Sequence, residues 1–332
     1  MRSFLDPPES VVDPSTGRPR WGSFAGRFRR VELGALPPSG LARLAVEKRW
    51  VYGLLAADPW LVGFAVVDLG YAASGFAYAY EHGRGMVASS SWLGVPRWCR
   101  VRQGDTARLD ARFVHPKGSI RVVERVGDPT VEVRIESPRL DVHATLDAKG
   151  APAAVTAVAP LGDAGVGVTE KRACLAVRGA ALVDGHRVSL DGALGGLDFT
   201  HGLLPHRTQW NWAFGLGRTR TGERVGFNLV EGFVGVGECA LWVDDRTVPI
   251  SEGRFTFDRA ARLGPWRVRS ADGEVDLEFE PGAEHTETRN LGLARSRFAQ
   301  PLGTFRGTLR VGDRILELDR CLGVVEDQDV VW

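Results

Sequence analysis

The side chains best suited to chemistry are concentrated in one stretch of the chain, residues 195–233. It combines carboxylates and imidazoles with aromatic and amide side chains: Asp198, His201, His206, Trp210, Asn211, Trp212, Asn228 and Glu231. The run W-N-W-A-F alternates, which predicts a strand with both tryptophans on one face. Asp198 and His201 precede it on a glycine-rich segment that we interpret as a connection, from which polar groups can point into a cavity. We expect a site for acid–base chemistry or ligand binding here.

Length and composition describe an ordinary globular protein. A chain of 332 residues suits two domains of about 150 residues each. Its hydrophobic content of 44% and charged content of 25% are usual. The net charge of +1 gives no electrostatic reason to expect nucleic acid or an anionic membrane as a partner.

Targeting and metal-binding signals are weak. The start has no apolar signal region, and no run approaches the ~18 apolar residues of a membrane span. The four cysteines, at positions 99, 174, 239 and 321, are too far apart for a cysteine-based metal site. We expect a cytoplasmic protein with reduced thiols and no integral membrane segment.

Most of the chain reads as short strands separated by turns. Residues 1–40 are rich in Pro, Gly, Ser and Arg and predict an extended arm. A short helix follows, with Ser39 as its N-cap. Alternating segments such as R-V-V-E-R-V and V-E-V-R-I-E are typical of antiparallel sheets with one buried face. We predict an all-β fold with little helix, in which residues 41–155 form a first β-barrel-like domain and residues 156–332 a second.

An internal repeat supports two similar units. Trp50 and Trp210 begin related segments 160 positions apart, and the V-G-F runs at Val62 and Val225 are 163 positions apart. One turn in the second copy would then be three residues longer than in the first. A duplicated β unit is the simplest account of this spacing.

Several motifs together resemble a bacterial family known only as domain of unknown function 2804 (DUF2804). They include W-N-W-A, V-G-F-N-L, E-C-A-L-W-V-D, P-W-R-V, F-A-Q-P-L-G-T-F and the closing G-V-V-E-D, and the resemblance runs from about Lys48 to Trp332. Two positions depart from that pattern. Cys239 stands where the family usually has Asn, and Gln328 where it usually has His, which puts activity in doubt if those positions act in catalysis.

More distantly, the order G-x-L-D-x-x-H followed by W-x-W looks like the hydroxyneurosporene synthase (carotenoid hydratase) and AttH-like group. This resemblance implies two consecutive lipocalin-like barrels, which agrees with the internal repeat. It also implies an acid that protonates a C=C bond, aromatic faces beside the cation, and a polar group that holds water.

Candidate residues follow from that chemistry. Asp198 or His201 would be the acid, since a carboxylate next to an imidazole favours its protonated form. Either Glu231 or Glu238 would hold water. The ligand-binding set is Trp210, Trp212, Asn228, Tyr71, Trp242 and Glu326. Each residue has a structural alternative: a hydrogen-bonded histidine, a core tryptophan, or a carboxylate paired with arginine.

Three functions remain open on the sequence. The first is a hydratase, cyclase or isomerase that acts without a cofactor on an apolar isoprenoid, lipid or polyketide-like molecule. The second is a carrier that binds such a lipid or pigment without chemistry. The third is a carbohydrate-active protein using two of Asp198, Glu231, Glu238 and Glu326.

Other sites lack the required sequence context. There is no G-x-S-x-G elbow or P-loop, and the glycine pairs at 83–85 and 215–217 lack a strand–turn–helix setting. His201 and His206 have no evident third metal ligand.

Overall fold

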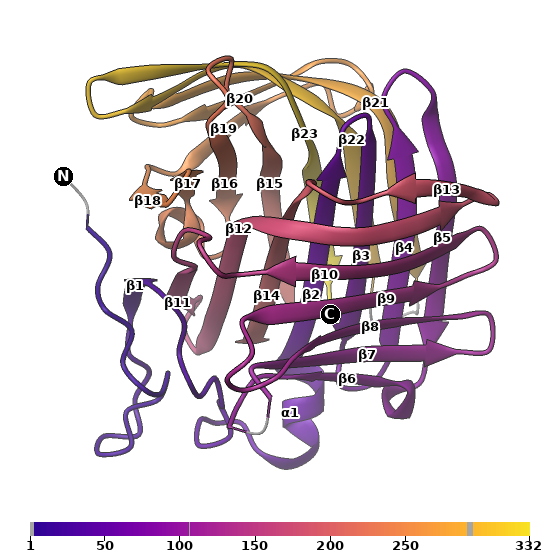
Figure 1. Cartoon of the computed structure of the whole chain (residues 1–332). Coiled ribbons are helices and arrows are strands. Elements are labelled where there is room, and N and C mark those ends of the chain that lie inside the picture. Colours follow the sequence, from indigo (N-terminus) through magenta and orange to yellow (C-terminus); the bar gives the residue numbers. More distant parts are fainter. Residues whose placement is uncertain (1–2, 106, 291–294) are drawn as a thin grey trace.

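The alternating segments form two antiparallel sheets in a computed structural model that describes residues 3–105, 107–290 and 295–332 (Figure 1). The first sheet contains β1 (Gly22–Ala25), β2 (Glu47–Ala57), β3 (Trp60–Asp68), β4 (Ala73–Glu81), β5 (Gly85–Gly94), β6 (Cys99–Arg102), β7 (Leu109–His115), β8 (Gly118–Glu124), β9 (Thr130–Glu136), β10 (Leu140–Asp147), β11 (Val155–Leu161), β12 (Gly165–Val183), β13 (His186–Ser189) and β14 (Leu194–Leu203). The second contains β15 (Arg207–Arg218), β16 (Arg224–Gly232), β17 (Ala240–Val243), β18 (Arg246–Pro249), β19 (Gly253–Thr256), β20 (Trp266–Ser270), β21 (Val275–Asn290), β22 (Arg295–Val311) and β23 (Arg314–Val331).

Helix is scarce in the described residues. The one α-helix, α1, spans Gly40–Val46, and two 3₁₀ turns span Pro96–Trp98 and Gly235–Glu238. Ser39 occupies the N-cap position of α1, as predicted, but its side chain makes no capping hydrogen bond. The all-β prediction with little helix is confirmed.

Strand order shows the duplication directly. The first sheet runs β5-β4-β3-β2-β14-β12-β10-β9-β8-β7-β6, and the second runs β18-β17-β16-β15-β23-β22-β21-β20-β19. The strands from β5 to β8 in the first order correspond one by one to those of the second, and β7 and β6 extend the first sheet further. The turn from β2 to β3 has two residues and the turn from β15 to β16 has five, which gives the three extra residues expected from the repeat.

The change from one sheet to the other falls at residues 204–206, later in the chain than the predicted division at 155/156. The strands between those two points, β12, β13 and β14, belong to the first sheet, because β12 pairs with β10 and β14 pairs with β2. The small-residue segment at 148–165 leads into β11 and on to β12 of the same sheet. The domain boundaries themselves stay a prediction.

Strands β2 to β4 are buried on both faces because the two sheets pack together. On β2, Val51 and Leu55 belong to the core of the first unit, while Tyr52 and Leu54 belong to a second core shared with residues of β15 to β23. Alternate side chains of one strand thus fill two different cores. This explains why the sequence of β2 and β3 is apolar at nearly every position.

The N-terminal arm packs into the first core and carries a charge with it. Its apolar side chains Val11, Phe24, Phe28, Val31, Leu33 and Leu36 are buried there. Between them Arg27 forms ion pairs with Glu124 and Glu170, each at 2.7 Å. Both carboxylates are buried. The arm is therefore part of the fold and closes the first unit.

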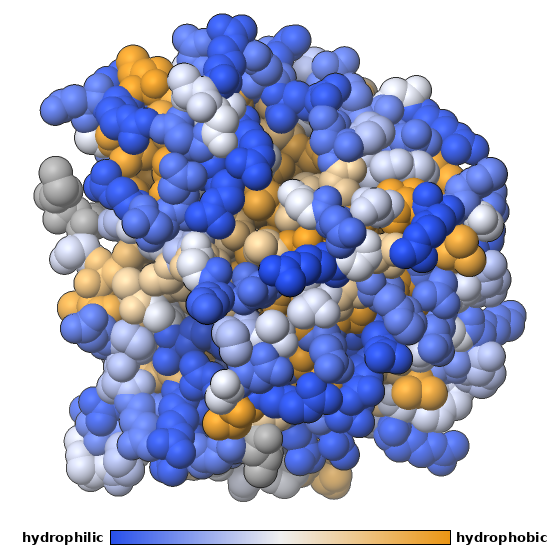
Figure 2. Space-filling model, in the orientation of Figure 1, coloured by the Kyte–Doolittle hydropathy of each residue, from blue (hydrophilic) through white to orange (hydrophobic). Residues whose placement is uncertain are grey.

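Hydrophilic side chains cover most of the face in view, with apolar residues between them (Figure 2). All four cysteines are free. In the described parts of the chain, no helix has the length and apolar character needed to cross a membrane.

Replacing Arg27 tests how strongly the arm is held. We expect Arg27→Ala to lower the free energy of unfolding by about 3–5 kcal/mol, because it removes the ion-pair partner of buried Glu170 and one of the two partners of buried Glu124. Arg29→Ala is the matched control, since Arg29 pairs with Asp105 on the surface and its loss should cost under about 1 kcal/mol. Urea unfolding of both variants gives the comparison; equal effects would show that the buried pairs do not hold the arm.

Candidate functional site

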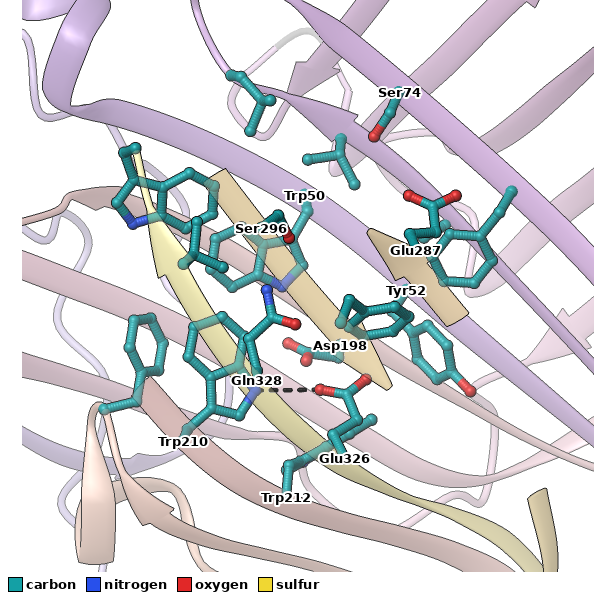
Figure 3. A pocket seen from close by; sticks show the side chains of 18 of the residues that line it. Trp50, Tyr52, Ser74, Asp198, Trp210, Trp212, Glu287, Ser296, Glu326 and Gln328 are labelled. Carbon is teal, nitrogen blue, oxygen red and sulfur yellow. Dashed lines mark hydrogen bonds between the residues drawn. The ribbon is translucent and has the colours of Figure 1, made fainter. Parts of the chain in front are cut away.

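A cavity of about 170 Å³ lies where the two sheets meet, and both repeats contribute to its wall (Figure 3). Most of the lining is aromatic or aliphatic, including Trp50, Tyr52, Ala65, Val67, Leu69, Tyr71, Phe76, Leu93, Trp210, Trp212, Val230, Phe233, Phe298, Val330, Val331 and Trp332. The polar lining residues are Ser74, Lys171, Asp198, Glu238, Glu287, Arg295, Ser296, Glu326 and Gln328. Tyr71 and Leu93 are 39% and 40% exposed, so this side of the cavity reaches solvent.

Paired aromatic residues from the two repeats form its central wall. Trp50 and Trp210, matched by the repeat, stack with ring centroids 6.2 Å apart and planes 13° apart. Phe233 packs against both rings, at 5.9 and 5.1 Å. Tyr52 and Trp212 meet edge to face at 5.4 Å. The duplicated segments therefore face each other across the site.

Two acidic residues occupy equivalent places in this arrangement. Asp198 on β14 lies directly across the strand pair from Tyr52. Glu326 on β23 lies directly across from Trp212. Since the repeat relates Tyr52 to Trp212, it also relates the two acids, and the strand alternation turns both toward the cavity.

Asp198 belongs to a buried charge cluster. Lys171 Nζ lies 2.7 Å from Asp198 Oδ2 and 3.2 Å from Glu238 Oε2, and 5.5 Å from the centre of the Trp212 ring. Burial by itself lowers the pKa of Lys171, but the two carboxylates outweigh it and raise this pKa. Burial raises the pKa of Glu238, and the charge of Asp198 adds to that effect.

Glu326 is the acid best poised for proton transfer near neutral pH. Burial raises its pKa to about 7, and the negative charge of Asp198 adds to the rise. Trp210 Nε1 donates a hydrogen bond to its Oε2 at 3.0 Å, and Gln300 Nε2 donates to its Oε1 at 2.6 Å. Both hydrogen bonds oppose the rise, because they favour the carboxylate. The carboxyl group therefore keeps its proton to a higher pH than an ordinary glutamic acid does.

The support of Glu326 continues away from the cavity. Tyr78 donates a hydrogen bond from its hydroxyl to Gln300 Oε1 at 2.6 Å, and its hydroxyl also lies 2.9 Å from that of Tyr52. Each of these side chains is buried. This series of hydrogen bonds fixes the orientation of the Gln300 amide, so that its Nε2 group is the one that donates to Glu326.

His201, predicted as an alternative acid, lies outside the cavity. The glycine-rich segment that we took for a connection is the strand β14, so that interpretation was wrong. Residues three apart in a strand point to opposite faces, and His201 turns toward the arm, where its Nδ1 is 2.8 Å from Val31 O and its Nε2 is 2.8 Å from Glu47. Burial lowers the pKa of His201.

The other predicted residues divide between the cavity and its surroundings. The cavity brings together Asp198, Glu238, Trp210, Trp212, Tyr71 and Glu326. Asn228 lies behind it, where it accepts a hydrogen bond from Trp212 Nε1 at 2.7 Å and donates one to Glu238 O at 2.8 Å. Glu231 contacts Arg254 near the surface. Trp242 is fully buried and donates to Ala153 O. The functional roles of all these residues stay predictions.

The two departures from the family pattern occupy different places. Cys239 is buried away from the cavity and accepts a hydrogen bond from Val230 N at its Sγ. Gln328 lines the cavity. Next to the cavity-lining Glu326, Asp327 contacts Arg259 at 3.5 Å.

Sequence reasoning missed Lys171 and Gln300. Lys171 is one of only four lysines, and its place between V-T-E and R-A-C-L-A-V was an available signal of a buried charge. Gln300 lies within the family-like motif F-A-Q-P-L-G-T-F, which was an available signal, but its contact with Glu326 depends on the pairing of β22 with β23.

Comparisons with known proteins agree with this architecture. The sequence profile of the family described as Domain of unknown function (DUF2804) matches residues 14–332. No curated protein sequence matches. Among solved structures, CghA superposes with a TM-score of 0.54 at 13% identity over 86% of this chain and 88% of that one. CghA with Sch210972 gives 0.53 at 12% identity, covering 87% and 89%.

A third structure, kievitone hydratase from Nectria haematococca, gives a TM-score of 0.50 at 13% identity over 94% of this chain and 98% of that one. At these identities the likeness shows a common fold. A hydratase is among the proteins that share it, as the distant resemblance in the sequence predicted.

The raised pKa of Glu326 predicts a pH-dependent stability. Its folded pKa of about 7 lies above the ordinary 4.5, so the contribution of the protonated group is complete below pH 4.5 and is lost as the pH rises to about 7. Relative to Glu326→Gln, the wild type should lose about 3 kcal/mol of unfolding free energy across this range. Denaturant unfolding at several pH values measures the difference; a difference independent of pH would contradict the assigned pKa.

Proposed function

This chain belongs to the DUF2804 family, and we propose that it catalyses acid–base chemistry without a cofactor on an apolar small molecule held between its two repeats. The reaction class is hydration, cyclisation or isomerisation at a C=C bond. The observation that carries this proposal is Glu326, a buried carboxyl group with a pKa of about 7 in an aromatic cavity. A general acid works best when its pKa is close to the working pH.

The reaction begins with proton transfer from the Glu326 carboxyl group to one carbon of the double bond. The neighbouring carbon becomes positive beside the faces of Trp50 and Trp210, whose π electrons attract a cation. Trp210 also donates its Nε1–H to the Glu326 carboxylate, which stabilises the negative charge left behind.

The cation then reacts in one of three ways, and each returns a proton. Water adds and loses a proton in a hydration. Loss of a proton from an adjacent carbon gives an isomer, and attack by a second double bond followed by proton loss gives a ring. The buried cluster of Lys171, Asp198 and Glu238 supplies carboxylate oxygens that accept this proton, and its transfer back to the Glu326 carboxylate restores the starting state.

Carriage of a lipid or pigment without chemistry is the second candidate. The apolar wall suits it equally, but a carrier gains nothing from three buried acids and a lysine, whose desolvation is costly. The carbohydrate-active alternative would need two carboxyl groups across an open, wet cleft. Asp198, Glu238 and Glu326 are each over nine-tenths buried, and aromatic and aliphatic side chains surround them.

The comparisons support this proposal only at the level of fold. One protein with the same fold is named a hydratase, and another has been solved with the small molecule Sch210972. Both fit a fold that can bind and transform small organic molecules. The predicted cytoplasmic location and the absence of a nucleic-acid partner belong to the proposal.

Native mass spectrometry of the protein purified from its own host identifies what it binds. We expect an apolar compound, released by solvent extraction, whose class supplies candidate substrates. A compound returned chemically unchanged by the purified protein would support the carrier instead.

Variants of Glu326 and Asp198 then test the chemistry. We expect Glu326→Gln and Asp198→Asn to lower kcat by about 10²–10⁴-fold, while Glu231→Gln, outside the cavity, leaves it unchanged. Wild-type kcat/KM should fall as the pH rises through about 7, because the protonated Glu326 is the active form. Full activity of Glu326→Gln, or a rate that increases over this range, would contradict the assignment.

A further inference from the structure

Gln328 lines the cavity but has no role in the proposed acid–base steps. Gln328 on β23 is 7% exposed, and in the described part of the chain its Oε1 has no hydrogen-bond partner. Buried amide groups are nearly always hydrogen-bonded, and an exception calls for an explanation. Figure 3 shows the amide among the side chains that line the cavity.

The neighbours of Gln328 leave its amide to the ligand. Trp210 and Phe298 flank it on the two adjacent strands, and both present aromatic rings to the cavity. Trp210 Nε1 already donates to Glu326, so it does not serve Gln328. The terminal amide torsion of glutamine is soft and roughly two-fold, so the group can turn either its oxygen or its nitrogen toward a ligand.

From this we propose that the substrate carries a hydroxyl group on its apolar skeleton and that Gln328 recognises it by a hydrogen bond. A hydroxyl both donates and accepts, which matches either orientation of the amide. A charged group on the ligand fits less well. It would lose its hydration on binding, and an uncharged amide between two aromatic rings does not compensate that loss.

The position of Gln328 also orders the substrate. Glu326 and Gln328 are two residues apart on β23, so their side chains share a face about 7 Å apart along the strand. Binding of the hydroxyl at Gln328 thus sets which double bond lies against the Glu326 carboxyl group. This inference rests on the proposed function for that consequence, but not for the recognition itself.

Calorimetric titration with two small probes of nearly equal shape tests the recognition. p-Cresol carries a hydroxyl where p-xylene carries a methyl group, and a cavity of this size can hold one ring, since an apolar cavity of about 150 Å³ binds benzene. We expect the wild type to bind p-cresol about 3–10-fold more tightly than p-xylene. In Gln328→Met, p-cresol affinity should fall about tenfold or more while p-xylene affinity stays within about twofold.

The same substitution at Gln209, an exposed residue of β15, is the matched control and should change neither affinity. Retained p-xylene binding shows that the cavity of the variant is intact. A preference for p-cresol that survives in Gln328→Met would overturn the inference. Loss of binding of both probes in Gln328→Met and in Gln328→Leu would also overturn it, because it would show that Gln328 maintains the shape of the cavity.

The outcomes separate this inference from the proposed function. Equal affinities of the wild type for the two probes would contradict the role of Gln328 but not the proposed catalytic role of Glu326. Selective binding of p-cresol, together with no turnover of the compound that co-purifies with the protein, would support recognition by Gln328 and contradict the proposed catalysis. Binding of neither probe would overturn the inference together with the apolar cavity on which it depends.

Discussion

Burial of titratable side chains between two packed sheets is the constraint on which the site depends. The strands β2 and β15 turn their aromatic residues toward each other, and the stacked pair Trp50 and Trp210 lines the cavity beside the acids. A carboxyl group in such a place is easier to protonate, because a charge there loses its hydration. The raised pKa of Glu326 is thus a consequence of the way the two repeats meet.

Duplication supplied the symmetry of the site, and divergence supplied its chemistry. Asp198 and Glu326 stand at equivalent positions, yet one is paired with Lys171 and the other is held by Gln300 and Trp210. The first therefore faces a positive charge, whereas the second has only uncharged hydrogen-bond donors in a buried place. Two related acids with different partners are a general route to an acid and a base in one cavity.

The same packing explains which other parts of the protein support the site. The first sheet must be apolar on both faces near β2 and β3, since one face fills its own core and the other fills the shared one. The N-terminal arm completes the first core and brings in Arg27, which compensates two buried acids. A rigid support of this kind keeps the acids and the aromatic faces in fixed relative positions.

Local sequence determined the class of fold, the duplication and part of the aromatic wall, namely Tyr71, Trp210 and Trp212. Alternation of side chains reports directly on strands, and the spacing of Trp50 and Trp210 reports on the repeat, since both are properties of one chain segment. It could not distinguish Asp198 from His201, because their facing depends on whether the segment is a loop or a strand. It marked Gln300 only as part of the motif F-A-Q-P-L-G-T-F and could not place it beside Glu326.

Only the tertiary structure decided which side chains share the cavity. Lys171 and Glu238 reach Asp198 from different strands and turns, and Glu326 takes its pKa from burial by both repeats. Contacts between residues far apart in the chain, and the dielectric surroundings they create, depend on how the sheets pack. No local pattern encodes that packing, which is why the sequence located the acids of the site but the assembled sheets assigned them their chemistry.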